Sequence, residues 1–115
     1  MNFSFGRGDD DNAIRENYER MGKAVGFSIE DVVASNQTHT TNVRLVGEED
    51  RGNGVVHPNA FQDVDGMITN TPGLVLATFY ADCVPLYFID PIHNAIGLSH
   101  SGWKGTVGKI GRVTI

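Results

Sequence analysis

Two apolar segments joined by a short turn constrain the fold of this chain more than any other feature. Residues 84–90 (VPLYFID) and 95–100 (AIGLSH) are rich in β-branched and aromatic side chains, and the PIHN between them contains proline and asparagine. This pattern is typical of a β-hairpin. The hairpin brings the start of its first strand beside the end of its second. We therefore expect Cys83 and His100 to meet at one edge, with Asp82 and Pro85 marking a strand break that presents Cys83.

The rest of the sequence alternates between helical and extended patterns. The sequence predicts helices at 12–25, 28–35 and from about 103, strands at 1–5, 37–46 and 74–81, and a long loop at 47–66. Gly26 is a natural stop for the first helix, and Ser28 with Asp31 occupies capping-box positions in the second. Together these elements predict an α+β fold in which a mixed β-sheet is flanked by helices.

Composition excludes several classes of protein. The chain has 115 residues, of which 40% are hydrophobic and 20% are charged, and its net charge is −5. This length suits one domain, and the negative charge argues against nucleic acid as the main partner. No apolar run approaches the roughly 18 residues of a membrane span, and the first residues lack the pattern of a signal peptide. One cysteine cannot form an internal disulfide, so a cytoplasmic protein is expected.

The final residues, 111–115 (GRVTI), end the chain inside an apolar pattern with no polar stop signal. This ending predicts that the chain continues in the intact protein. A sheet interrupted in this way exposes an edge and apolar surface. Self-association of the chain is therefore plausible.

Three side chains have the chemistry of a metal site. Neutral imidazole and thiolate are good zinc ligands, and Cys83 and His100 are expected to meet in the hairpin, with His39 from an earlier strand as a third ligand. These three would leave a fourth zinc position open to water or substrate, as catalysis requires. Two alternatives remain. Cys83 is either a small core hydrophobe, or a nucleophile with a histidine base and Asp82 as third partner, without any metal.

The other charged and imidazole side chains have simpler interpretations. His57 precedes a proline in the long loop and His93 lies in the predicted turn, so both are expected to be solvated. Arg44 and Lys104 are surface charges by default. Either can bind an anion if the strand ends converge.

Four ordered segments resemble a known family. QTHTTNV (37–43), DGMITN (65–70), ADCVPLYF (81–88) and HSGWKGT (100–106) are similar to motifs of the bacterial laccase-domain, or polyphenol oxidase, family. Members of that family are regarded as zinc-containing enzymes that process purine nucleosides. The resemblance covers residues 1–115, which look like a single family region incomplete at both ends.

The resemblance implies an activity and a set of site residues. It makes His39, Cys83 and His100 the metal ligands, and it implies phosphorolysis of adenosine or inosine, with adenosine deamination and methylthioadenosine cleavage alongside. The expected cofactor is zinc rather than copper, and the expected partners are purine nucleosides and phosphate. On such a site Asp82 would accept a proton or orient a ligand, beside Cys83 in a catalytic role. Arg44 and Lys104 would bind phosphate.

Departures from the family pattern keep other functions open. Family members are about twice as long as this chain, Thr40 stands where glycine is common, and Lys104 replaces a more frequent arginine without its bidentate fork. Four histidines are too few for the blue and trinuclear centres of a multicopper oxidase. The alternatives are a metal-free cysteine hydrolase and an inactive fragment that binds purine or a protein partner.

Overall fold

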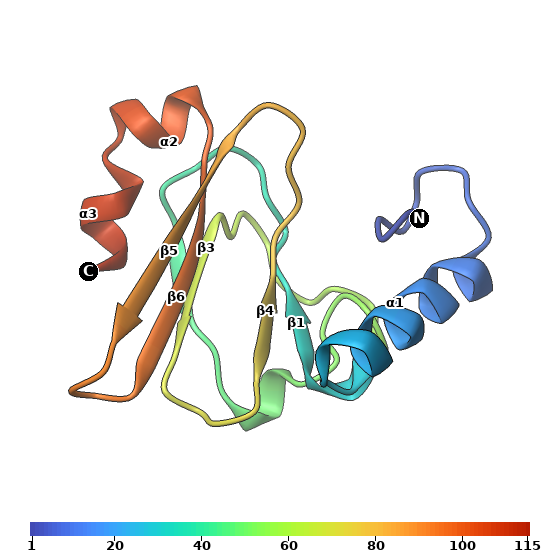
Figure 1. Cartoon of the computed structure of the whole chain (residues 1–115). Helices are drawn as coiled ribbons and strands as arrows, with labels where there is room; N and C mark the ends of the chain where they lie inside the picture. Colours follow the sequence, from blue (N-terminus) through green and yellow to red (C-terminus); the bar gives the residue numbers. More distant parts are fainter.

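The computed structural model describes residues 1–115, and Figure 1 shows the course of the chain. The elements are α1 (Asp11–Val25), η1 (Ile29–Asp31, 3-10), β1 (Val32–Ala34), β2 (Val43–Leu45), η2 (Glu48–Asp50, 3-10), β3 (Gly66–Thr69), β4 (Val75–Ala77), β5 (Val84–Asp90), β6 (Ala95–Ser101), α2 (Trp103–Val107) and α3 (Ile110–Thr114). None of the helices is both long and apolar enough to cross a membrane.

The predicted hairpin is confirmed. β5 and β6 pair antiparallel along their whole lengths, from Val84 opposite Ser101 to Asp90 opposite Ala95. Pro85 does not interrupt the pairing as expected, because it lies inside β5 opposite His100. β5 pairs only with β6 and is therefore an edge strand, where a residue without an N–H group is tolerated. The strand break instead lies just before Val84.

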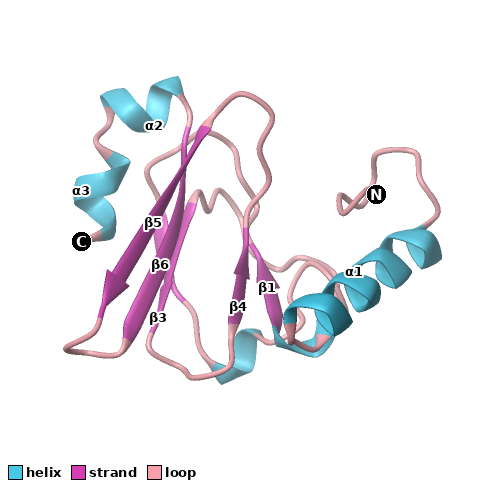
Figure 2. Ribbon diagram, viewed as in Figure 1, coloured by secondary structure: helices cyan, strands magenta, loops and turns pink.

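The chain forms an α+β fold with a mixed sheet, as predicted. The larger sheet has the order β2-β3-β6-β5, in which β2 and β3 are parallel and the other pairs antiparallel. β1 and β4 form a separate parallel pair. Figure 2 shows α2 and α3 on the outer side of the larger sheet, and the β1–β4 pair between that sheet and α1. The mixed sheet therefore has helices on one side and a second strand layer on the other.

Two apolar clusters hold these layers together. One contains Val33, Val46, Phe61, Val64, Met67 and Leu74, and joins β1 to the larger sheet. The other contains Ile14, Tyr18, Val32, Ala34 and Val55, and joins β1 to α1. Successive residues of β1 enter different clusters because side chains alternate along a strand. β1 is thus buried on both faces and connects the two halves of the core.

Helix α1 follows the sequence prediction closely. The Asp10 side chain accepts a hydrogen bond from the Asn12 N–H at its start, and Gly26 ends it in a left-handed conformation at φ 99°. Tyr18 is buried and donates its hydroxyl hydrogen bond to the Phe3 carbonyl at 2.9 Å. Burial raises the pKa of Tyr18 to about 12. Its ring packs against Phe3 and Phe5, which anchor the N-terminal segment to the helix.

Four predicted elements are wrong or shorter than expected. The strand predicted at 74–81 is reduced to Val75–Ala77, because its only partner, β1, is three residues long. Residues 28–35 form a 3-10 turn and then β1 rather than a helix, because the β-branched Val32 and Val33 are fully buried beside β4. Residues 1–5 contain no strand, since they pack through Phe3 and Phe5 without a pairing partner. The predicted strand at 37–46 is reduced to Val43–Leu45, and residues 38–40 turn around a buried carboxylate instead.

Gly66 is a tight point in the larger sheet, and its replacement gives a test of the packing. A Cβ atom there would lie 2.5 Å from Ser99 Oγ and 3.0 Å from Val43 Cγ2. We expect Gly66→Ala to lower the free energy of unfolding by about 1–3 kcal/mol in urea denaturation, because overpacking displaces β6 or β2. Gly111→Ala is the control, since its Cβ would approach no atom closer than 3.4 Å. Equal stability of the two variants would contradict this packing.

Candidate metal centre

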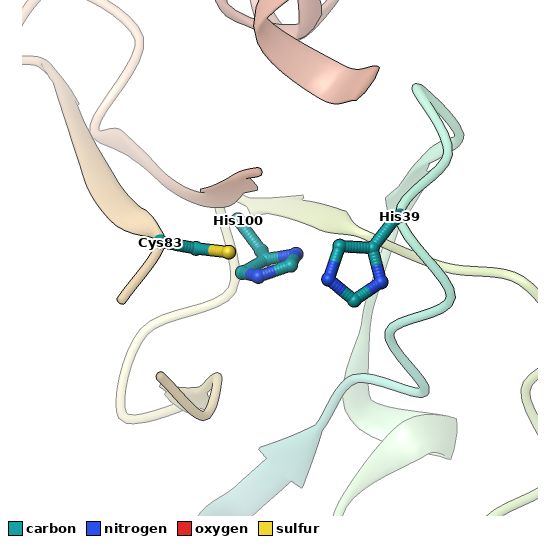
Figure 3. A group of neighbouring side chains, drawn as sticks. All are labelled: His39, Cys83 and His100. Atoms are coloured by element: carbon teal, nitrogen blue, oxygen red, sulfur yellow. The ribbon is translucent and has the colours of Figure 1, made fainter. Parts of the chain in front are cut away.

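Three side chains from separate parts of the chain converge at one end of the larger sheet. His39 comes from the segment after β1, Cys83 directly precedes β5, and His100 lies near the end of β6. One ligand atom of each lies within 4.8 Å of the others. Figure 3 shows the thiol and the two imidazole rings directed toward a common space. The structure thus brings together the three side chains that the sequence singled out.

The hairpin fixes the distance between Cys83 and His100. Since Pro85 is opposite His100 in the ladder, Cys83 lies just beyond the paired end of β5. His39 is brought to the same place by a bridge from Gln37, whose side-chain amide donates to the Phe79 carbonyl and accepts from the Phe79 N–H, both at 2.7 Å. This bridge ties the segment before His39 to the segment before Cys83.

A buried carboxylate, Asp65, lies behind the two histidines. Its Oδ1 accepts hydrogen bonds from His100 Nδ1 at 2.8 Å and from the His39 N–H at 3.0 Å. Its Oδ2 accepts from the N–H groups of Thr38 at 3.1 Å and Thr40 at 2.8 Å, and from Thr40 Oγ1 at 3.0 Å. Burial raises the pKa of Asp65, but the hydrogen bonds from Thr40, His100 and Thr38 outweigh burial and hold that pKa below its ordinary value.

Because Gly102 has no side chain, the space between His39, Cys83 and His100 stays open. A Cβ atom at this position would lie 2.8 Å from His39 Cδ2 and 3.2 Å from Cys83 Sγ. Tetrahedral zinc with nitrogen and sulfur ligands places those ligand atoms about 3.5 Å apart. Small side-chain rotations from the observed separations reach this geometry. The donor set and the unfilled space therefore fit a metal ion with three protein ligands.

The three side chains line an open pocket of about 570 Å³. The remaining lining residues are Ser4, Arg7, Ser35, Gln37, Phe79, Tyr80, Ala81 and Asp82. Tyr80 stands beside His100, with ring centroids 5.5 Å apart, and burial raises the pKa of its hydroxyl. Asp82 is an exposed side chain of the pocket wall. A small molecule that enters this pocket can therefore reach the side chains of His39, Cys83 and His100 directly.

Arg44 and Lys104, the predicted phosphate-binding residues, do not line this pocket. Arg44 stacks over the Phe61 ring at 4.4 Å, and its Nη2 lies 3.5 Å from Asp50 Oδ1. Lys104 Nζ lies 5.6 Å from the centroid of the Trp103 ring. Arg7, on the glycine-rich segment before α1, is instead the cationic side chain of the pocket, and it forms no ion pair.

The other two histidines lie apart from the metal-ligand group. His57 is exposed. His93 is also exposed, and its Nδ1 contacts Asp90 Oδ2 at 2.7 Å in the hairpin turn. These positions agree with the expectation that both side chains are solvated.

Sequence reasoning missed three residues of this site: Asp65, Arg7 and Gly102. Asp65 had a visible signal, because it directly precedes the apolar segment GMIT, where a carboxylate must be buried or capped. Gly102 lies in the HSGWKG segment, but its role depends on atoms from two distant segments. Arg7 carries no local signal, since only the tertiary fold brings the N-terminal segment to the pocket.

Comparisons with known proteins agree over nearly the whole chain. The profile of the family described as multi-copper polyphenol oxidoreductase laccase matches residues 1–115. The purine nucleoside phosphorylase YlmD of Geobacillus stearothermophilus is 38% identical over 96% of this chain and 40% of its own length. An adenosine deaminase from an unknown prokaryotic organism is 30% identical over 94% of this chain and 42% of its own.

A solved structure shares the fold. The crystal structure of the hypothetical protein YfiH from Bacillus licheniformis superposes with a TM-score of 0.91 at 33% identity, covering 97% of this chain and 42% of that one. The chain therefore spans about 40% of the length of each of these three proteins.

Replacement of Gly102 tests whether the space between the three ligands receives a metal. The backbone φ of −74° at Gly102 suits alanine, so the effect of Gly102→Ala is steric. We expect this variant to bind zinc about tenfold more weakly, or ~1.4 kcal/mol, in a competition assay with a chromophoric chelator. Gly105→Ala is the control, because its Cβ would meet no atom closer than 3.4 Å. Unchanged affinity in Gly102→Ala would show that the metal lies elsewhere.

Proposed function

Because this chain belongs to the multi-copper polyphenol oxidoreductase laccase family, we propose that it contributes the zinc centre of a purine nucleoside phosphorylase, with His39, Cys83 and His100 as ligands. The observation that carries this proposal is the convergence of three ligand side chains in an open pocket. The relatives named as purine nucleoside phosphorylases support the substrate class. They are longer than this chain, so the activity of the whole protein is part of the proposal.

The proposed reaction cleaves the glycosidic bond of adenosine or inosine. A phosphate oxygen forms a bond to C1′ of the ribose, the bond from C1′ to N9 breaks, and the purine leaves with its electron pair and takes up a proton. The products are the free base and ribose 1-phosphate. A bound zinc ion would supply a Lewis acid beside the reacting groups. Methylthioadenosine has the same glycosidic bond and is a second substrate for this chemistry.

Residues of the pocket wall have distinct proposed roles. Asp82 orients a substrate hydroxyl or accepts a proton, because its exposed carboxylate stands next to Cys83 on the wall. Arg7 holds the phosphate, since a guanidinium with no carboxylate partner can donate two parallel hydrogen bonds to an oxyanion. Arg44 and Lys104 stay candidates for phosphate binding from the sequence, and their present contacts with Phe61 and Trp103 would have to be exchanged for it.

Adenosine deamination is a second proposed reaction of the same pocket. The relative named as an adenosine deaminase favours it. In this reaction water adds to C6 of the purine and ammonia leaves, giving inosine. Asp82 can accept the proton of the attacking water and return it to the leaving nitrogen.

Two other functions make different demands on the site. A metal-free cysteine hydrolase needs Cys83 with one histidine base, whereas here both His39 and His100 approach the thiol. The His100 ring is hydrogen-bonded to Asp65 rather than to Asp82, the expected third partner. A fragment that only binds purine, or a protein partner, would need no metal ligands in an open pocket. The arrangement of two imidazoles and one thiol favours the zinc centre over both.

Metal content and turnover together test the proposed function. We expect purified chelator-free protein to contain one zinc per chain by elemental analysis, and to convert inosine and phosphate to hypoxanthine and ribose 1-phosphate. Cys83→Ala should lose the zinc and at least 100-fold of the activity, roughly 2.7 kcal/mol or more of transition-state stabilisation. Copper instead of zinc in the protein would change the metal assignment.

Other outcomes would contradict the proposal. A covalent adduct on Cys83 in zinc-free, active protein would establish the cysteine hydrolase. Zinc-loaded protein without turnover of inosine or adenosine would support the binding fragment.

Alanine variants of the three cationic candidates test the phosphate site. We expect Arg7→Ala to raise the KM for phosphate about 10- to 150-fold, because one charge-assisted contact contributes about 1.5–3 kcal/mol, and to change the KM for inosine less. Arg7→Lys should recover part of the loss, since it keeps the charge without the bidentate fork. Arg44→Ala and Lys104→Ala are measured in parallel. A larger rise in the phosphate KM for either of them would move the phosphate site to that residue.

A further inference from the structure

We propose that Asp65 is the positioning residue of the metal centre and orients both imidazole ligands through one carboxylate. This inference rests on the proposed function only in assigning His39 and His100 to a metal. Asp65 is fully buried and lies outside the pocket lining, so it does not touch a bound substrate. Its effect on the site passes through the two histidines.

The first action of Asp65 is on the ring of His100. His100 Nδ1 lies 2.8 Å from Asp65 Oδ1, and a carboxylate oxygen can only accept a hydrogen bond. The proton of the neutral imidazole therefore sits on Nδ1, which leaves the lone pair of Nε2 free to bind a metal. The backbone N–H of His100 also donates to the Asp65 carbonyl, at 2.7 Å. Both ring orientation and tautomer of His100 are thus set by one neighbour.

The second action of Asp65 is on the backbone that carries His39. The N–H groups of Thr38, His39 and Thr40 all point to its carboxylate, at distances of 3.1, 3.0 and 2.8 Å. His39 has a left-handed backbone at φ 66°, which is unfavourable for a residue with a side chain. A carboxylate that accepts three successive N–H groups compensates this strain. His39 is exposed and has little packing of its own, so this turn determines where its ring lies.

These two actions explain why one carboxylate is buried at this place. Asp65 receives hydrogen bonds from both ligand-bearing segments, and their donors replace the water it loses. An amide of the same shape cannot do the same. In Asp65→Asn, one side-chain atom becomes a donor and faces N–H or ring N–H groups that also donate.

The test compares Asp65→Asn with a matched control, Asp63→Asn. Asp63 lies on the same segment, is exposed, and accepts from Thr38 Oγ1 at 2.7 Å without contact to either histidine. We expect Asp65→Asn to weaken zinc binding about 10- to 100-fold in chelator competition, as is usual when the hydrogen-bond partner of a metal ligand is lost. Asp63→Asn should bind zinc as the unmodified chain does.

Two measurements on metal-free protein separate this role from a general loss of stability. Nitrogen chemical shifts of the unmodified chain should show His100 protonated at Nδ1, with Nε2 unprotonated. Amide hydrogen exchange at Thr38, His39 and Thr40 should be faster in Asp65→Asn, while exchange in α1 is unchanged. The first measurement needs no variant, so it holds even if Asp65→Asn does not fold.

Distinct outcomes overturn the two proposals. An Nε2-protonated His100 in the unmodified chain, or folded Asp65→Asn with undiminished zinc affinity, would overturn the positioning role. Absence of zinc binding by the unmodified chain would instead overturn the proposed metal centre. The tautomer and exchange measurements would still decide what Asp65 does.

Discussion

The pairing of β6 with strands on both of its sides is the constraint on which the site depends. On one side β5 places Pro85 opposite His100, which leaves Cys83 at the end of the ladder. On the other side β3 places Gly66 opposite Ser99, which brings Asp65 next to His100. A slip of one residue in either register would reverse the faces of the strand and separate the ligands. The long hairpin makes that slip costly, because its ladder runs from Val84 to Asp90.

The site places polar side chains at one end of a sheet that is otherwise largely apolar. The buried polar atoms of these side chains have hydrogen-bond partners within the protein. Ser99, His100 and Ser101 are buried at the end of β6, together with Asp65. No buried side-chain nitrogen or oxygen atom in the chain lacks a hydrogen-bond partner. This network holds the His100 ring and the backbone of His39 in place, because each hydrogen-bond partner would have to be replaced at once. Preorganisation of this kind favours binding, since little order has to be created when a ligand arrives.

The sequence predicts the local elements of this protein better than its long-range contacts. The hairpin, α1 and the meeting of Cys83 with His100 follow from apolar periodicity and from one turn. The local pattern of residues 28–35 predicts a helix, but burial of Val32 and Val33 between two layers selects a strand. The position of Arg44 beside a family motif predicts that it binds phosphate. In the fold its guanidinium instead contacts Asp50 and the Phe61 ring. Arg7 reaches the pocket through tertiary contacts that no local pattern encodes, and the hydrogen-bond partners of Asp65 come from segments distant in the sequence.

The separation of the three proposed metal ligands along the chain has a thermodynamic consequence. His39 is distant in the sequence from Cys83 and His100, which lie at the two ends of one hairpin, and the three side chains meet through noncovalent contacts. An ion held by all three acts as a crosslink that closes two loops and is absent from the unfolded chain. Its binding free energy adds to the stability of the folded state in proportion to the logarithm of the free ion concentration. If the proposed ion binds here, the melting temperature of this domain would report the metal supply of its surroundings.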